Sequence, residues 1–386
     1  MRVAVYGGSF NPPHIGHMDA ARAALQELRP DIFLMIPSFI PPHKDAPSSS
    51  PSPEERLRLI QLAAEEVPGV RVSDIEMRRG GKSYTVDTLG YISEQYPGAE
   101  LFLIVGTDML ETFEQWRDFK TILSMVTLTV MAREAGQDTY VQECADKLIK
   151  QYGAKVIIIE KPPLPMASTD IRAILSGRRG NECLPAAVYE EIIRKRLYGA
   201  KPELGWLRKK AYDHLSPNRI PHVTGCEQEA VKLAGTWGED PSDAAEAAIL
   251  HDITKKLSHA EQLHLCEKYD IVIDTLERDN AKLLHAKTGA ALSKDLFGVP
   301  EPIYSAIFWH TTGREDMTLL EKIIYLADYI EPTRDFEGVE PLRALAYEDI
   351  DKAMELGLRM SVEDLEHSGK TIHPNTIAAL KWFSHR

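Results

Sequence analysis

Two histidines and a run of glycines near the start of the chain have the spacing of a phosphate-binding loop. Residues 7–17 read Gly-Gly-Ser-Phe-Asn-Pro-Pro-His-Ile-Gly-His and follow an apolar run. Glycines let the backbone approach an anion closely, and N–H groups at a helix start attract negative charge. His14 and His17 are three residues apart at the expected helix start, so their rings share one face. We therefore expect this loop to hold phosphate groups and to stabilise charge that develops during their transfer.

A second set of candidate ligands lies more than two hundred residues later, around the dipeptide His251-Asp252. This pair ends an apolar helical run, 244–250. Adjacent helical residues point about 100° apart, so the pair can flank a metal centre only if other helices supply more ligands. Imidazole and carboxylate together suit iron, manganese and similar divalent ions better than a structural zinc site. The candidate metal ligands are His222, His251, Asp252, His285, His310 and Asp328.

The elements that must position the first loop alternate between apolar runs and helical patterns. Buried strands are expected at 2–6, 32–37, 70–75, 101–105, 127–131 and 156–159. Between them, helices are expected at 18–28, 54–67, 85–95 and 141–152. This alternation predicts a Rossmann-like α/β domain with a doubly wound parallel sheet. Ligands of such sheets bind beyond the carboxyl ends of the strands, which is where the loop at 7–17 begins.

The pattern changes at a turn-rich segment, 199–205, which we interpret as a linker between a domain at 1–198 and a domain at 206–386. The second domain is predicted to be all-α. Its helices are expected at 227–237, 242–251, 259–269, 281–296, 301–310, 318–330, 346–368 and 371–383. Its histidines outside the ligand set share no spacing and are interpreted as surface residues: His259, His264, His367, His373 and His385.

Composition narrows the class of protein. The net charge of −13 argues against binding to a nucleic-acid backbone, which favours a basic face, but not against small phosphorylated substrates. No apolar run has the length of a membrane span, and the start of the chain lacks a signal-peptide pattern. The four cysteines form no close pair, so we expect no disulfide framework and a reduced, cytoplasmic location. The sequence leaves open whether the protein forms a homo-oligomer.

The loop at 7–17 resembles the phosphate loop of the nucleotidyltransferases that carry the HIGH signature. Residues 1–198 as a whole resemble bacterial nicotinate-nucleotide adenylyltransferases. Further matching segments occur in the family's order: 41–44, 83–89, 106–108, 113–117 and 168–172. The resemblance implies that nicotinate mononucleotide attacks the α-phosphorus of Mg²⁺-bound ATP. Pyrophosphate would then leave, giving nicotinate adenine dinucleotide for NAD synthesis, with catalysis by positioning and charge stabilisation.

The same resemblance implies the residues of this first site. His14 and His17 would stabilise the phosphates during transfer. The implied ATP-binding residues are Gly7, Gly8, Ser9, Phe10, His14, His17, Lys44, Ser168, Thr169 and Arg172. The implied nicotinate-mononucleotide-binding residues are Thr85, Gly106, Asp108, Trp116 and Arg133. The hydroxyls of Ser168 and Thr169 can cap the helix that follows, although Ala167 stands where the family often has serine. The preference for nicotinate over nicotinamide mononucleotide rests on resemblance alone.

The order His…His-Asp…His…His…Asp resembles the HD-domain metal-dependent phosphohydrolases. The closer resemblance is to the YqeK-like group and implies hydrolysis of diadenosine tetraphosphate to two ADP. Two divalent ions would activate water and clamp the phosphates, with iron expected and manganese or another ion as the alternative. Lys255, four residues after His251 on the same expected helical side, would act as a catalytic cation beside the polyphosphate. Weaker candidates of the same kind are Arg219 and Arg334.

The sequence therefore predicts a bifunctional enzyme without nucleic-acid or membrane partners, acting on ATP, nicotinate mononucleotide and diadenosine tetraphosphate. Two alternatives stay open at this point. The helical domain could be a regulatory module that binds a nucleotide or a metal and modulates a single adenylyltransferase. It could also be a hydrolase of (d)NTPs or of nucleoside monophosphates.

Overall fold

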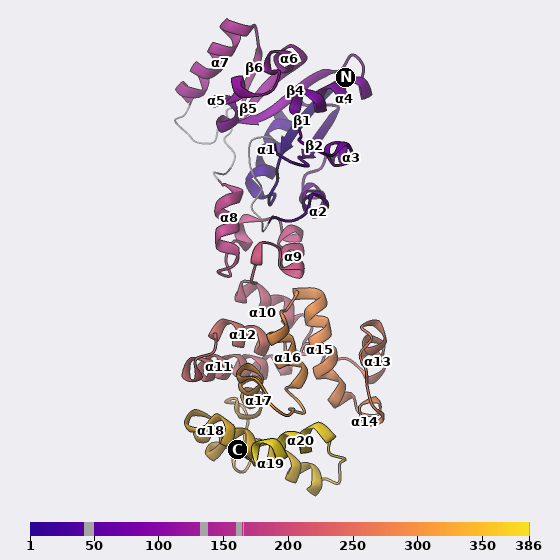
Figure 1. The fold of residues 1–386 in the computed structure, drawn as a ribbon, viewed down its shortest axis with the longest axis vertical. Coiled ribbons are helices and arrows are strands. Elements are labelled where there is room, and N and C mark those ends of the chain that lie inside the picture. The colour runs from indigo at the N-terminus through magenta and orange to yellow at the C-terminus, as the bar shows by residue number, and fades with distance from the viewer. Residues whose placement is uncertain (42–49, 132–137, 160–163, 165, 386) are drawn as a thin grey trace. The chain divides into compact units, whose positions relative to one another are not determined.

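The computed structural model divides the chain into two compact units, Met1–Lys201 and Pro202–Arg386 (Figure 1). It describes residues 1–41, 50–131, 138–159, 164 and 166–385. The division between the units falls inside the segment 199–205 that the sequence indicates as a linker. Each unit has its own hydrophobic core.

A six-stranded, fully parallel sheet forms the centre of the first unit, in the order β3-β2-β1-β4-β5-β6. The strands are β1 (Arg2–Gly8), β2 (Ile32–Pro37), β3 (Val70–Val72), β4 (Glu100–Gly106), β5 (Val126–Met131) and β6 (Lys155–Ile159). This confirms the predicted α/β class. The expected third strand was too long, because the polar pair Ser73-Asp74 ends the apolar run and a helix begins at Ile75.

The strand order creates a switch point between β1 and β4. From β1 the chain moves outward through β2 to β3, and it then returns to β4 and moves outward on the other side. Loops at the carboxyl ends of the two central strands therefore diverge and leave a crevice for a ligand. The helices of this unit are α1 (Ile15–Leu28), α2 (Pro53–Ala64), α3 (Ile75–Arg79), α4 (Thr85–Gln95), α5 (Thr107–Glu111), α6 (Phe119–Met125), α7 (Asp138–Tyr152), α8 (Ser168–Leu175) and α9 (Ala186–Lys195).

The described part of the second unit is helical throughout, as predicted, and contains no strand (Figure 1). Its longer helices are α10 (Leu204–Tyr212), α11 (Ile220–Trp237), α12 (Pro241–Leu250), α13 (His259–Lys268), α15 (Ala281–Phe297), α16 (Glu301–Trp309), α17 (Leu319–Ile330), α18 (Val339–Glu348), α19 (Ile350–His367) and α20 (Pro374–Phe383). The short α14 (Thr275–Arg278) follows α13. Within the described residues, no helix is long and apolar enough to cross a membrane.

Several expected helices of this unit were wrong in their bounds. The helix expected at 227–237 begins earlier, at Ile220, and so includes His222. The segment 346–368 is two helices, because Asp349 adopts an extended conformation and its side chain caps α19 by accepting a hydrogen bond from the Lys352 N–H group. The helix expected to include His251 ends at Leu250, and residues 251–256 form turns. α12 is buried on all sides from Ala244 to Leu250, which makes it the central helix of the unit.

The start of α17, the helix that carries Asp328, depends on a capping box. The Thr318 hydroxyl accepts a hydrogen bond from the Glu321 N–H group at 3.3 Å, and the buried Glu321 carboxylate accepts one from the Thr318 N–H group at 2.9 Å. Thr318→Ala should lower the free energy of unfolding by about 1 kcal/mol, because a helix donor loses its acceptor. Urea denaturation followed by tryptophan fluorescence would measure this, with Thr318→Ser as the control that keeps the hydroxyl. Equal stability of both variants would contradict the capping role.

Candidate active sites

The two histidines of the first loop lie against each other where β1 passes into α1. Their ring centroids are 3.7 Å apart. The His14 backbone N–H group donates to His17 Nδ1 at 3.2 Å. A neutral His17 therefore carries its proton on Nε2, which can donate to a phosphate oxygen. Gly16 leaves room for the His14 ring and for the Leu164 backbone, because an added Cβ would lie 3.1 Å from His14 Nδ1 and 2.8 Å from the Leu164 carbonyl oxygen.

A cavity of about 1110 Å³ extends from this loop across the carboxyl ends of the central strands. Its volume exceeds the roughly 300–1,000 Å³ that is usual for one small-molecule site, so it has room for two nucleotides. The predicted site residues that line it are Gly7, Gly8, Ser9, Phe10, His14, His17, Thr85, Gly106, Asp108, Trp116, Ser168, Thr169 and Arg172. Two further predicted residues, Lys44 and Arg133, lie outside the described residues.

Ser168 and Arg172 hold the phosphate loop instead of capping α8. The Ser168 hydroxyl donates to the Pro12 carbonyl at 2.9 Å, and the Arg172 guanidinium donates to the Asn11 carbonyl at 2.5 Å. The expected cap by the hydroxyls of Ser168 and Thr169 is wrong. The helix N-cap is Ala167, whose methyl group offers no acceptor, and the Thr169 hydroxyl accepts from Arg172.

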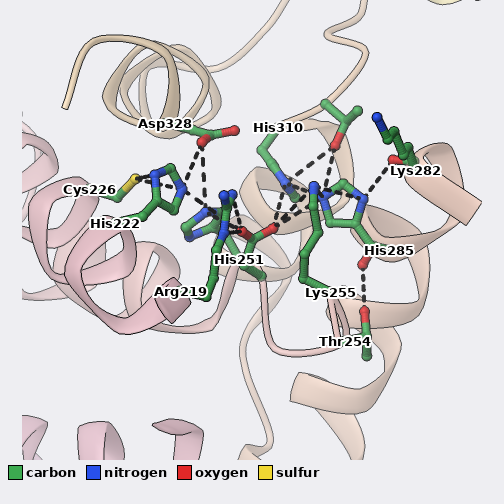
Figure 2. Close-up of polar contacts among 12 residues, drawn as sticks. Arg219, His222, Cys226, His251, Thr254, Lys255, Lys282, His285, His310 and Asp328 are labelled. Carbon is green, nitrogen blue, oxygen red and sulfur yellow. Dashed lines mark hydrogen bonds and ion pairs between the residues drawn. The ribbon is translucent and has the colours of Figure 1, made fainter. Parts of the chain in front are cut away.

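In the second unit, the six predicted ligands lie together, with the buried carboxylate of Asp252 between the others. Figure 2 shows the labelled side chains of the other five. The Asp252 Oδ2 atom is 3.8 Å from His222 Nε2 and 3.5 Å from His251 Nε2. Its Oδ1 atom is 3.2 Å from His285 Nε2 and 3.8 Å from His310 Nε2. Asp328 joins the Oδ2 side, with its Oδ1 atom 3.0 Å from His222 Nε2. One carboxylate thus faces two groups of potential ligands.

The imidazole rings are oriented as ligands of a cation. His251, His285 and His310 each direct Nδ1 at the carbonyl three residues earlier, at 2.7, 2.6 and 2.6 Å. Because a carbonyl only accepts, each Nδ1 carries the proton and each Nε2 presents a lone pair. The Nε2 atoms of His285 and His310 are only 3.0 Å apart, and His251 Nε2 and Asp252 Oδ1 are buried without a hydrogen-bond partner. These residues fit divalent metal ions, as the sequence predicts.

The charges of the cluster differ from ring to ring. Burial opposes protonation of His251, but the carboxylates of Asp252 and Asp328 outweigh it and raise the pKa of this ring. Burial, with smaller effects from neighbouring histidines, lowers the pKa of His310 to about 3, so this ring stays neutral. Burial opposes ionisation of Asp252, but contacts with His251 and His285 outweigh it and hold the carboxyl pKa well below its usual value. Asp252 therefore carries a negative charge over the whole physiological pH range. His310 stays neutral over the same range, so its Nε2 lone pair can bind a metal.

Lys255 joins the cluster as predicted, but the expectation that it shares a helix face with His251 was wrong. It lies in the turns after α12 and not on a continued helix face. Its Nζ atom is 2.9 Å from His285 Nε2 and 3.7 Å from Asp252 Oδ1. The guanidinium groups of Arg219 and Arg334 contact Asp252 and Asp328, respectively. Three cationic side chains therefore border the ligands, where they can meet a polyphosphate.

Comparison with known proteins agrees with the division of the chain into two units. Residues 5–174 match the cytidylyltransferase-like family model, and residues 219–333 match the HD domain model. A probable nicotinate-nucleotide adenylyltransferase of Gemmatimonas aurantiaca is 36% identical over 205 residues, covering 52% of this chain and 94% of that protein. The chain belongs to the nicotinate-nucleotide adenylyltransferase family. Its second unit is an HD domain.

Two other similar proteins are named as hydrolases. A Mycoplasma pneumoniae protein, named as a probable nicotinate-nucleotide adenylyltransferase/Ap4A hydrolase, is 25% identical and covers 92% of this chain and 97% of its own length. A crystal structure of a predicted HD superfamily hydrolase involved in NAD metabolism, from Clostridium acetobutylicum, is 37% identical. It covers 47% of this chain and 97% of its own, with a TM-score of 0.46.

The HD domain contains two cluster residues to which the sequence assigned no role. Glu331 is fully buried and its Oε1 atom lies 3.0 Å from His222 Nδ1, so the carboxylate orients this ring with Nε2 toward Asp328. A side chain at Gly225 would overlap the Glu331 carboxylate. Cys226 is buried beside His222. Glu331 lies three residues after Asp328, and Cys226 lies four residues after His222. This helical spacing from a predicted ligand is the sequence feature that could have identified both residues.

His373 was expected at the surface of the HD domain but is only 6% exposed. It is the N-cap of α20, and its Nδ1 atom accepts a hydrogen bond from the Asn375 N–H group at 3.1 Å. Its Nε2 atom, 3.4 Å from the Glu277 carboxylate, must then carry the proton. A protonated Nε2 does not bind a metal, so we interpret the group of His373, Glu277 and Asp274 as structural.

Arg56 is a residue of the adenylyltransferase unit that the sequence analysis missed. It is 5% exposed and lines the cavity. Its guanidinium donates to the carbonyls of Ser9, Ser38 and Phe39 at 3.1, 2.6 and 2.7 Å. Arg56 therefore ties the phosphate loop to the end of β2 and brings positive charge to the cavity. Nothing in its helix pattern distinguished it from the exposed Arg58.

Replacing Arg56 should slow adenylyl transfer more than it weakens substrate binding. Arg56→Met releases the loop, and a misplacement of about 1 Å can lower kcat roughly 100-fold. Arg56→Lys should recover part of this loss, because an ammonium group can still donate to the carbonyls. Steady-state kinetics with both nucleotides would measure kcat and KM, with Arg58→Met as the matched control. A change in thermal stability with unchanged kcat would assign Arg56 a structural role only.

Proposed function

We propose that the first unit transfers the adenylyl group of ATP to nicotinate mononucleotide, giving nicotinate adenine dinucleotide. The observation that carries this proposal is one cavity, large enough for two nucleotides, that joins the phosphate loop to Thr85, Asp108 and Trp116. Family membership supports it through relatives that bear this name. Trp116 already packs on Phe113 at 4.9 Å between ring centroids, and its ring borders the cavity where a pyridine ring can stack.

The geometry favours catalysis by positioning. A phosphate oxygen of the mononucleotide forms a bond to the α-phosphorus of ATP while the bond to the pyrophosphate oxygen breaks. His17 Nε2–H and the backbone N–H groups at the start of α1 stabilise the charge that develops on the phosphate oxygens. His14 supports His17 by stacking and through its backbone hydrogen bond. Bound Mg²⁺ would neutralise the triphosphate, which is why few protein cations are needed.

We further propose that the HD domain hydrolyses diadenosine tetraphosphate to two ADP. The supporting observation is the two-sided carboxylate of Asp252, with imidazole ligands on both sides. The cations Arg219 and Lys255 lie beside it, and Arg334 lies beside Asp328. Two divalent ions held there would activate water and polarise the phosphates, and we expect iron as the native metal. The cations suit a chain of several phosphates better than one, and the Mycoplasma relative bears the corresponding name.

The cytoplasm is the proposed location, since all four cysteines are free thiols.

Substitutions in the full-length protein should separate the two activities. Asp252→Asn should remove nearly all hydrolase activity, because it takes the shared anion from both ligand groups, and should leave adenylyl transfer unchanged. His17→Ala should have the opposite effect, lowering adenylyl transfer about 100-fold or more. Coupled assays for pyrophosphate release and for ADP formation from diadenosine tetraphosphate would measure both reactions in each variant.

The alternatives give different results in the same assays. A regulatory HD domain would bind metal without any turnover, and Asp252→Asn would then alter adenylyl transfer. A hydrolase of (d)NTPs or nucleoside monophosphates would act on those nucleotides and leave diadenosine tetraphosphate intact. His259→Ala, at an exposed histidine outside the cluster, is the matched control for loss of an imidazole.

A further inference from the structure

A thiol lies inside one half of the metal-ligand cluster. Cys226 follows His222 by one turn of α11, so both side chains occupy the same helix face. Its Sγ atom is 3.4 Å from His222 Nε2, the ring nitrogen that faces Asp328 (Figure 2). Cys226 is 1% exposed, and its sulfur therefore contacts the cluster and not solvent.

The surroundings of this sulfur are those of a ligand. Cys226 Sγ and one ligand atom each from His222, His251 and Asp328 all lie within 4.8 Å of one another. Independently, His251 Nε2 is directed into this group, is fully buried and has no hydrogen-bond partner. In the described residues, a second grouping at Asp252 contains His251, Asp252 and His310 but no sulfur.

We propose that Cys226 is a sulfur ligand of the metal ion held by His222, His251 and Asp328. This proposal rests on the proposed function of the HD domain as a metal-dependent hydrolase. The sulfur–metal bond forms as the thiol proton leaves to solvent or to a nearby carboxylate. A second ion beside His285 and His310 would be held by nitrogen and oxygen ligands only. The two ions would therefore be chemically different.

This difference has a consequence for metal choice. Thiolate is a soft ligand that favours iron, cobalt and zinc over magnesium and manganese. The half of the cluster with Cys226 should select such metals, while the half with His285 and His310 accepts manganese more readily.

Cobalt absorption tests the sulfur–metal bond directly. The full-length protein would be stripped with a chelator and reloaded with Co²⁺, and the bound metal would be counted by elemental analysis. A cobalt–thiolate bond gives a charge-transfer band in the near ultraviolet that nitrogen and oxygen ligands do not give. We expect this band in the wild type and in Cys266→Ala, which removes a buried thiol on α13 outside the cluster. We expect its loss in Cys226→Ala and Cys226→Ser.

Titration of the stripped protein with Co²⁺, followed by the same absorption, gives the affinity of each metal site. Cys226→Ala should weaken binding of one Co²⁺ ion by about tenfold or more and leave the other unchanged, since loss of even an indirect contact has that effect. Cys226→Ser, which keeps the volume and an oxygen, should shift the preference of that ion from cobalt toward manganese. It also serves as the test if Cys226→Ala does not fold.

The outcomes are distinguishable. Two bound Co²⁺ ions in the wild type without a charge-transfer band, or a band that persists in Cys226→Ser, would overturn the sulfur ligand and leave the proposed hydrolase intact. A wild type that binds no Co²⁺, Mn²⁺ or Fe²⁺ would instead remove the metal centre, and with it both the proposed hydrolase and the sulfur ligand.

Discussion

The buried carboxylate of Asp252 is the constraint around which the HD domain is organised. Removing one carboxylate from water costs several kcal/mol unless nearby groups compensate it. Here the compensation comes from the cations Arg219 and Lys255, while four imidazoles, on or next to α11, α12, α15 and α16, present Nε2 to the same carboxylate. Three of those imidazoles are oriented in the same way, by a hydrogen bond from Nδ1 to the carbonyl three residues earlier. The packing of separate helices and the chemistry of the site therefore depend on the same anion.

The first unit organises its site through backbone carbonyls. Arg56, Arg172 and Ser168 all donate to carbonyls of the phosphate loop, and so the loop is held in shape by cations and a hydroxyl. A carboxylate in the same position would bind the guanidinium groups equally well but would repel the substrate phosphates. Carbonyl partners leave the positive charge available to the cavity. This explains how a chain with a net charge of −13 can hold anionic nucleotides.

The sequence was sufficient wherever one residue type and a fixed spacing carry the chemistry. The strand–helix alternation predicted the parallel sheet, and the ligand order predicted which six side chains meet in the HD domain. The sequence was insufficient where a functional side chain acts through a backbone atom or through a side chain distant in the sequence. Arg56 acts through carbonyls that only folding brings together, and Asp349 breaks a helix through a local extended conformation. Lys255 was identified by a helical spacing, yet it reaches His285 from a turn.

Each site is built from one unit alone. The cavity residues all lie between Val5 and Arg172, and the candidate metal ligands all lie between His222 and Asp328. Among the described residues, each site therefore draws its side chains from one unit. On the first side of the boundary at residue 201, one side chain reaches back to the phosphate loop. Tyr198 donates from its hydroxyl to the Asn11 side chain at 2.7 Å, and Asn11 belongs to the phosphate loop. Tyr198 has a left-handed backbone, with φ at 61°, which is unfavourable for a bulky residue. The hydrogen bond from Tyr198 to Asn11 joins backbone ones, from the N–H groups of Gly199 and Lys201 to the carbonyls of Arg196 and Leu175, so the end of the first unit and the phosphate loop are fixed together.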